Sequence, residues 1–216
     1  MMANTHTYPR REEIANAITH GIGALLSLAG LVLLIVFSSM KGTAWHVVSF
    51  TIYGVSMLLL YSCSTLVHSF KEGKIKDLFE FFDHSSIYIY IAGTYTPFLL
   101  VAVRGPLGWS LFGIVWGIAL LGVVFKAFFV KRFLFMSTIF YLIMGWLIVI
   151  AWGPLVAAVP NPGIVLLVTG GLLYTLGTVF YVWRAFPYHH AIWHLFVLAG
   201  SVTHFFAILL YLLPHR

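Results

Sequence analysis

The sequence predicts an all-α integral membrane protein in which residues 1–216 form a single domain, a bundle of seven transmembrane helices. Hydrophobic residues make up 61% of the chain and charged residues 8%, whereas soluble domains carry about 45–50% and about 25%. The chain also contains seven apolar stretches of roughly the 20 residues that a helix needs to cross a bilayer. They run over Ala17–Phe37, Trp45–Phe70, Phe79–Val103, Leu107–Phe125, Phe133–Gly153, Gly163–Trp183 and His189–Leu213.

This composition excludes a soluble globular enzyme, a disordered chain and a nucleic-acid-binding protein. Twelve Lys and Arg and six Asp and Glu are too few to cover a surface that faces water. The single cysteine, Cys63, excludes a disulfide framework and a cysteine-rich metal site. Seven spans of about 22 residues leave only about 60 positions for loops and tails. Any chemistry is therefore expected inside the bundle or at its rim.

Arginines and prolines agree with the ends of these stretches, taken in chain order. The first stretch follows Arg10 and Arg11, but it is too long for a signal peptide and lacks an Ala-x-Ala cleavage site, so it is expected to be retained. Pro97 lies inside the third stretch, near its end, where we expect a kink or local unwinding. The other prolines lie outside the stretches or at their ends, where the missing N–H costs little. These are Pro9, Pro106, Pro154, Pro160, Pro162, Pro187 and Pro214.

The distribution of basic residues predicts how the bundle is oriented. When alternate connections are assigned to opposite sides of the membrane, nine of the twelve Lys and Arg fall on one side. These nine are Arg10, Arg11, Lys71, Lys74, Lys76, Lys126, Lys131, Arg132 and Arg184. Cytoplasmic loops carry the excess of basic residues. We therefore expect a short cytoplasmic N-terminal segment, residues 1–16, and a C-terminus outside.

Several ionisable side chains lie within the apolar stretches, where they are costly and indicate function. His68 ends the second stretch, Asp83 lies near the start of the third, and His190 and His194 begin the seventh. Given the alternating direction of the helices, all four are expected at one depth near the cytoplasmic face. Ser64 lies one helical turn before His68 and points to the same region.

The spacing of these residues predicts a metal site. His190 and His194 are four residues apart, so both imidazoles lie on one face of a helix, and His68 can supply a third nitrogen. Three neutral imidazoles are typical of an open catalytic zinc site. Asp83 is then expected to hold or deprotonate the metal-bound water, or to orient a histidine. Taken singly, an intramembrane histidine is more typical of a buried donor between helices, and we interpret the remaining ones in this way. They include His20, His46, His84, His189 and His204.

Together, these residues resemble the bacterial hemolysin III branch of the progestin and adipoQ receptor superfamily. The matching motifs cover nearly the whole chain. They are Glu13-x-x-Asn16-x-x-Thr19-His20-x-x-Gly23, Ser64-x-x-x-His68, Asp83, Gly93-Thr94-Tyr95-Thr96-Pro97, and His190-x-x-x-His194 followed by His204.

The resemblance implies a multi-pass protein of the cell membrane with a zinc ion held by His68, His190 and His194, and with Asp83 against the zinc-bound water. Similar membrane proteins, including alkaline ceramidases, share this pattern and hydrolyse lipid amides. We therefore expect a hydrolase of a lipid amide or ester that acts in membrane lipid homeostasis, with Asp83 moving the proton and Ser64 positioning the water or the oxyanion. Two alternatives stay open: a cytolysin that permeabilises membranes, and a non-catalytic sensor in which zinc ties helices together.

Overall fold

The computed structural model describes residues 8–214, which form helices and no β-strand. Within that range, seven helical segments are long and apolar enough to span a membrane, which confirms the predicted all-α class. The helices are α1 (Arg10–Lys41), α2 (Ala44–Ser69), α3 (Lys74–Pro97) with the π-helix η1 (Phe98–Ala102), α4 (Pro106–Phe129), α5 (Leu134–Trp146) with the 3-10 helix η2 (Leu147–Ala151) and α6 (Trp152–Ala158), α7 (Asn161–Val182) and α8 (His189–Tyr211). Large apolar side chains such as Leu121 and Phe128 are 72% and 75% exposed on the outside of the bundle, as expected of a surface that faces lipid.

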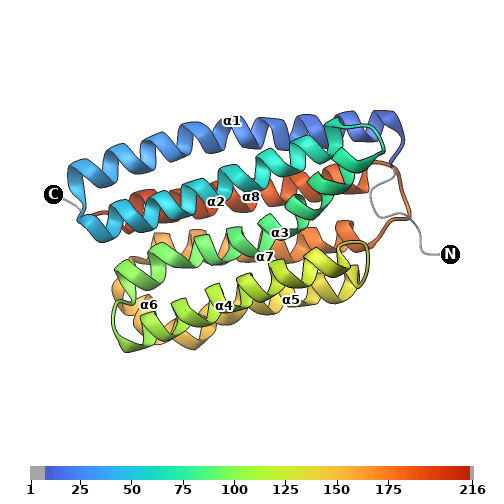
Figure 1. The fold of residues 1–216 in the computed structure, drawn as a ribbon. Coiled ribbons are helices and arrows are strands. Elements are labelled where there is room, and N and C mark those ends of the chain that lie inside the picture. Colours follow the sequence, from blue (N-terminus) through green and yellow to red (C-terminus); the bar gives the residue numbers. More distant parts are fainter. Residues whose placement is uncertain (1–7, 215–216) are drawn as a thin grey trace.

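The start of α1 and the end of α8 lie at opposite ends of the bundle (Figure 1), as an odd number of spans requires. We call the end at which α1 begins the basic end, because the predicted set of nine Lys and Arg lies there. The α2–α3, α4–α5 and α7–α8 connections are also at this end. Residues 10–16, expected to belong to a tail, are already part of α1. Glu12 and Glu13 in the first turn favour this early start, since negative charge stabilises a helix N-terminus.

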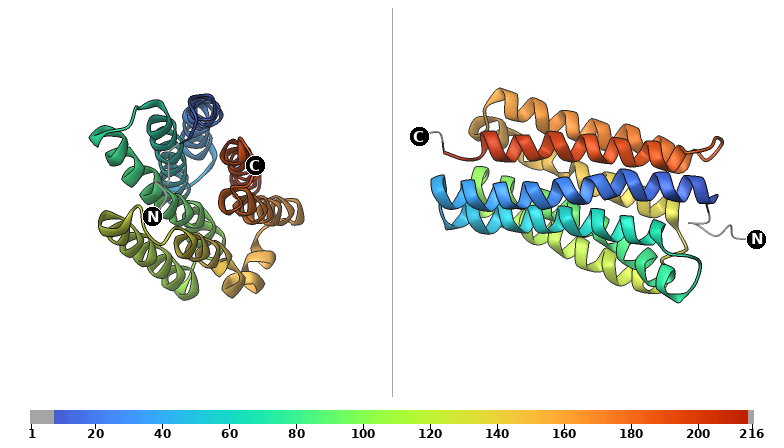
Figure 2. Two further views of the ribbon diagram at one scale, coloured as in Figure 1. Left: turned by 90° about the vertical axis from the view of Figure 1, so that its right-hand side faces the viewer. Right: turned by 90° about the horizontal axis from the view of Figure 1, so that it is seen from above.

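Six of the spanning segments surround the interior of the bundle. Neighbouring helices pack in the order α1, α2, α3, α5, α7, α8 and back to α1, while α4 packs outside against α3. Figure 2 shows this arrangement from the end of the bundle. In the most apolar 18-residue stretch of each segment, 72% of the residues are buried in the segment that contains α3, compared with 28% in α1. The polar residues that α3 carries are therefore placed inside the protein.

Two prolines lie where the regular helix is interrupted. Pro97 ends α3, and the chain continues as the π-helix η1, in agreement with the local departure expected there. Pro154 differs from expectation, because the fifth span does not end at Gly153 but continues to Ala158. The 3-10 helix η2 precedes this proline and a new helix, α6, starts at Trp152. Pro154 thus lies in the first turn of α6, where a proline N–H has no helical partner to lose.

Candidate metal centre

Three histidines from two helices meet inside the basic end of the bundle. His68 comes from the last turn of α2, and His190 and His194 come from the first two turns of α8. One ring nitrogen from each of the three lies within 4.8 Å of the others, and all three residues are buried. The ring centroids of His190 and His194 are 4.5 Å apart, and each lies 5.1–5.3 Å from that of His68. The predicted histidine set is therefore assembled, with the one-turn spacing on α8 placing two rings side by side.

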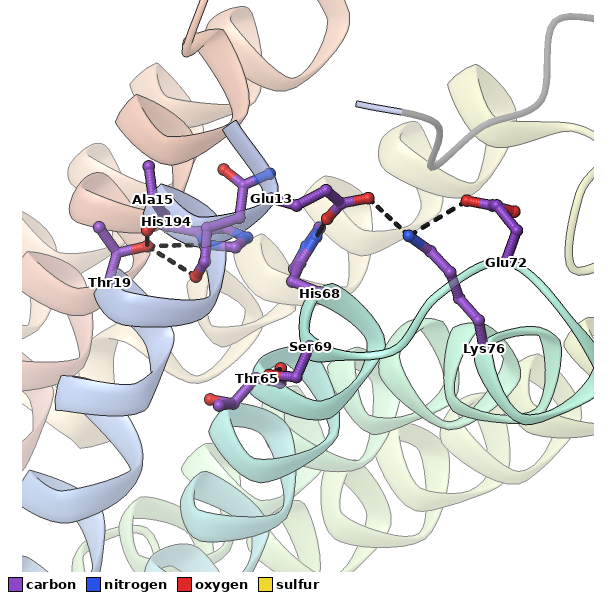
Figure 3. A network of polar contacts seen from close by, with 10 residues as sticks. Glu13, Ala15, Thr19, Thr65, His68, Ser69, Glu72, Lys76 and His194 are labelled. Atoms are coloured by element: carbon purple, nitrogen blue, oxygen red, sulfur yellow. Dashed lines mark hydrogen bonds and ion pairs between the residues drawn. The ribbon is translucent and has the colours of Figure 1, made fainter. Parts of the chain in front are cut away.

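His68 is held by an acidic residue from the first turn of α1. Its Nδ1 lies 2.6 Å from Glu13 Oε2, and the other carboxylate oxygen accepts a hydrogen bond from Lys76 Nζ at 2.5 Å. Figure 3 shows Glu13 between the two side chains, with Glu72 forming a second, longer contact to Lys76 of 3.3 Å. Since a carboxylate accepts, His68 donates from Nδ1. The lone pair of this tautomer is on Nε2, the nitrogen left to ligate a metal.

His194 is oriented by α1 as well, through residues about one helical turn after Glu13. Its Nδ1 lies 3.2 Å from the backbone oxygen of Asn16 and 3.1 Å from Thr19 Oγ1. The carbonyl oxygen of Asn16 can only accept, so Nδ1 carries the proton and the lone pair is again on Nε2. His20 stacks on His194 with a centroid separation of 3.4 Å and an interplanar angle of 12°. Residues near the start of α1 thus fix the orientation of two of the three histidines, His68 and His194.

Tyr8, just before α1, lies against the histidines at the basic end. Its ring centroid is 5.0 Å from that of His190, 5.8 Å from His189 and 6.0 Å from His68. Burial raises the pKa of the Tyr8 hydroxyl above its ordinary value, so this side chain is a neutral phenol. The chain that leads into α1 therefore covers the cluster with an uncharged aromatic ring.

Asp83 and Ser64 meet on the inner side of the cluster. Both residues are buried, and the Ser64 hydroxyl lies close enough to the Asp83 carboxylate to interact with it. They line the same cavity as His190 and His194. The two residues predicted to carry chemistry are therefore in contact with each other beside two of the predicted ligands.

The cavity that they line has a volume of about 150 Å³. Its wall is built by residues from α1, α2, α3, α5, α7 and α8, the same six helices that surround the interior. Apolar side chains dominate the middle of the wall and include Leu60, Ile87, Ile91, Leu142, Trp193 and Val197. An apolar cavity with a few polar groups in its wall is the usual form of a site for a small, largely apolar ligand.

The other histidines divide into two groups. His46 bonds to the backbone oxygen of Leu212 at 3.1 Å and His189 to that of Phe180 at 2.9 Å, so both are buried groups that join segments, as interpreted from the sequence. His20 differs from that interpretation, because it packs on His194 of the histidine cluster and lines the cavity. His204 joins α8 to α7 as interpreted, since its Nε2 lies 2.9 Å from the backbone oxygen of Leu167. It also lines the cavity, ten residues along α8 from His194 and thus away from the cluster. His84 lines the cavity too, with Nε2 3.5 Å from the Tyr181 hydroxyl.

Glu13, Lys76 and Tyr8 contact the histidine cluster or its support but were not among the site residues predicted from the sequence, although Glu13 belongs to the first of the matching motifs. The nearness of Glu13 to His68 could have been predicted in part. A carboxylate in the first turn of α1 must lie at the same end of the bundle as His68, which is at the end of α2. The contact itself depends on how closely α1 and α2 pack over that turn, which no spacing within one helix specifies.

Comparison with known proteins places the chain in a family. Residues 8–205 match the family model described as "Haemolysin-III related". The chain is 60% identical to a hemolysin-3 homolog of Bacillus subtilis (strain 168), over 93% of this chain and 94% of the relative. It is 56% identical to hemolysin-3 of Bacillus cereus, over 94% and 93%. Human monocyte to macrophage differentiation factor is 31% identical over 93% of this chain and 84% of its own length. The chain is therefore a multi-pass membrane protein that belongs to the haemolysin-III-related family.

Proposed function

We propose that this protein is a membrane-embedded, metal-dependent hydrolase that cleaves an amide or ester bond of a lipid and so takes part in membrane lipid homeostasis. One observation carries the proposal. Three histidine nitrogens lie within 4.8 Å of one another, beside an internal apolar cavity whose wall also carries Asp83 and Ser64. Ionisable groups gathered at one point inside a membrane bundle are costly to maintain and indicate a functional site.

The donor set fits zinc. Zinc accepts neutral imidazole nitrogens, and in catalytic sites three protein ligands leave one position open. His68 and His194 each have Nδ1 engaged by an oxygen from α1, which is the usual way in which ligand histidines are oriented. His68, His190 and His194 would hold the ion. When bound, it supplies Lewis acidity, which acidifies water and polarises a carbonyl oxygen.

The remaining residues have distinct roles in this proposal. Asp83 accepts a proton from the attacking water at its carboxylate and returns that proton to the leaving group. Ser64 lies beside the Asp83 carboxylate, and its proposed role is to donate to that carboxylate and so orient the base. This role is narrower than the positioning of water or oxyanion expected from the sequence. The apolar wall, with Leu60 and Ile87 among its residues, holds the hydrocarbon part of the lipid and keeps bulk water out.

Metal analysis of purified protein, combined with a hydrolysis assay on lipid amides and esters in mixed micelles, tests this proposal. Wild type should contain about one zinc per chain, and His190→Ala should lose it together with all hydrolysis. Asp83→Asn should keep the metal but lose hydrolysis by roughly 10²–10⁴-fold. His46→Ala is a matched control, because His46 is buried on α2 about 33 Å from the cluster by helix rise. Wild-type protein that is metal-free without exposure to chelators would contradict the proposal.

The names of two relatives, hemolysin-3 and a hemolysin-3 homolog, favour a second candidate function, the permeabilisation of membranes. Purified protein added to red cells separates the two. Lysis that persists in both His68→Ala and His194→Ala favours a pore that is independent of the histidine cluster. Lysis that disappears in both variants and in Asp83→Asn favours damage by lipid hydrolysis.

A further inference from the structure

The cavity has a second polar end, away from the histidine cluster. His194 and His204 both line it and are ten residues apart on α8, which corresponds to about 15 Å along the helix. Tyr90 on α3 and Tyr174 on α7 line the cavity at the same level as His204, and the rings of Tyr174 and His204 have centroids 5.3 Å apart. Between the two ends the wall is largely apolar. The cavity therefore suits a molecule with two polar groups separated by a hydrocarbon chain.

Behind Tyr90 and Tyr174, every hydroxyl proton is donated to an acceptor within the protein. Ser201 Oγ donates to the backbone oxygen of Val197 at 2.9 Å. It accepts from Tyr61 at 2.7 Å and from Tyr90 at 3.0 Å, which uses both of its lone pairs. The Tyr174 hydroxyl lies 3.0 Å from both Ser201 Oγ and the Tyr90 hydroxyl. With both Ser201 lone pairs in use and the Tyr90 proton donated to Ser201, the arrangement that satisfies every proton has Tyr174 donating to the Tyr90 oxygen. In this arrangement none of these hydroxyl groups in the described residues has a proton free to donate to a ligand. The Tyr174 oxygen still has lone pairs that can accept a hydrogen bond.

His204 adds a second acceptor at this end. Its Nε2 lies 2.9 Å from the backbone oxygen of Leu167, so Nε2 donates and Nδ1 has the lone pair. The Nε2 edge packs on Gly170, where a Cβ would collide with the ring. The opposite edge carries Nδ1, which has no hydrogen-bond partner in residues 8–214 although the side chain is only 6% exposed. An unpaired buried polar atom costs about 1–3 kcal/mol, so it indicates a missing partner.

We infer that this end of the cavity is a second ligand subsite, which accepts a hydrogen bond from a hydroxyl group on the hydrocarbon chain of a lipid. Both groups on offer, His204 Nδ1 and the Tyr174 hydroxyl oxygen, are acceptors, so a carboxylate or phosphate has nothing to bind here. An ammonium group would leave charge and protons unpaired among apolar walls. The inference rests on the proposed function in one respect: the other polar group of the lipid is expected at the histidine cluster.

The test compares pairs of probes that differ by one hydroxyl. Saturated 1-alkanols and the α,ω-alkanediols of equal chain length are added to purified protein in detergent. Binding is measured from the rise in melting temperature. At the length that spans both ends of the cavity, the diol should reach the same stabilisation at about one-tenth of the alkanol concentration, as one good hydrogen bond allows. Shorter and longer pairs should show little difference.

Three variants locate the effect. Tyr174→Phe removes one oxygen and keeps the ring, and His204→Phe removes the imidazole acceptor. Because the ligand hydroxyl has one proton and two acceptors are on offer, each substitution should reduce the preference for the diol and the two combined should abolish it. Tyr181→Phe is the control, because Tyr181 lines the cavity and contacts His84 at 3.5 Å, outside this cluster.

Equal binding of diols and alkanols by wild type, no binding of either, or a preference that survives the two cluster substitutions combined would overturn the inference. Metal content is measured on the same samples. Metal-loaded protein without the preference rejects the subsite alone, whereas metal-free protein that keeps the preference rejects the proposed hydrolase alone.

Discussion

At the proposed zinc site, replacing Glu13 by glutamine is expected to weaken zinc binding about tenfold. The His68 Nδ1 to Glu13 Oε2 distance of 2.6 Å is that of a short, charge-assisted hydrogen bond. Such a bond is worth about 1.5–3 kcal/mol, compared with about 0.5–1.5 kcal/mol for a neutral one. Glutamine keeps an acceptor but loses the charge, so the loss is about 1.4 kcal/mol, or a factor of ten in affinity. Loss of a group that supports a ligand histidine typically costs 10–100-fold.

The affinity is measured by competition between purified protein and a zinc chelator, with the absorption spectrum of the cobalt-substituted protein as a second readout of ligand geometry. Glu12→Gln is the matched control. Glu12 is the neighbouring residue and accepts from the backbone N–H of Tyr188 at 3.1 Å rather than from a ligand histidine. Equal zinc affinity of wild type and Glu13→Gln, with unchanged cobalt spectra, would refute the assignment of Glu13 as a positioning residue.

Three further predictions concern packing, metal and topology. Gly23→Ala should destabilise the protein by about 1–3 kcal/mol in a thermal or denaturant melt, because a Cβ there meets the Tyr61 ring. Gly21→Ala is the control and should be tolerated, because its Cβ would lie 3.7 Å from Thr65. Equal destabilisation by the two substitutions would refute this reason. Removing the metal with a chelator should lower the melting temperature of wild type but not that of His194→Ala, since a ligand that binds only the folded state stabilises it; an unchanged wild-type melt would exclude a role of the metal in holding helices together. A reporter fused after the last residue should report an extracytoplasmic location; a cytoplasmic signal would contradict the predicted orientation.

The seven spans could be read from the sequence because each depends on local properties. Length, apolar composition and the positions of prolines are enough to find a helix that crosses a bilayer. The ends are less well determined: α1 begins at Arg10 rather than near Ala17, and the fifth span passes through Pro154. Polar residues still extend a helix when the first turn carries acids. A proline is accommodated when the preceding turn is a 3-10 helix.

The candidate site was predicted in part, for a related reason. His190 and His194 lie on one face by helix periodicity, and the direction of each span places His68 and Asp83 at the same depth. Depth alone does not say which faces turn inward. The contact of Ser64 with Asp83, the stacking of His20 on His194 and the bond from His68 to Glu13 all depend on the rotation of α1, α2 and α3 about their axes.

The amino-acid sequence by itself determined the membrane class, the number of spans, the common depth of four ionisable residues and the family, because these follow from composition and from helical periodicity. Only the tertiary structure decided that α1 supplies the support of the histidine cluster, that α4 lies outside the ring of helices, and that His204 lies at a second polar end of the cavity. These features depend on side-chain packing between helices that are distant in sequence. In a bilayer, that packing is chosen by close contacts and interhelical hydrogen bonds, since hydrophobicity alone does not favour one neighbouring helix over another.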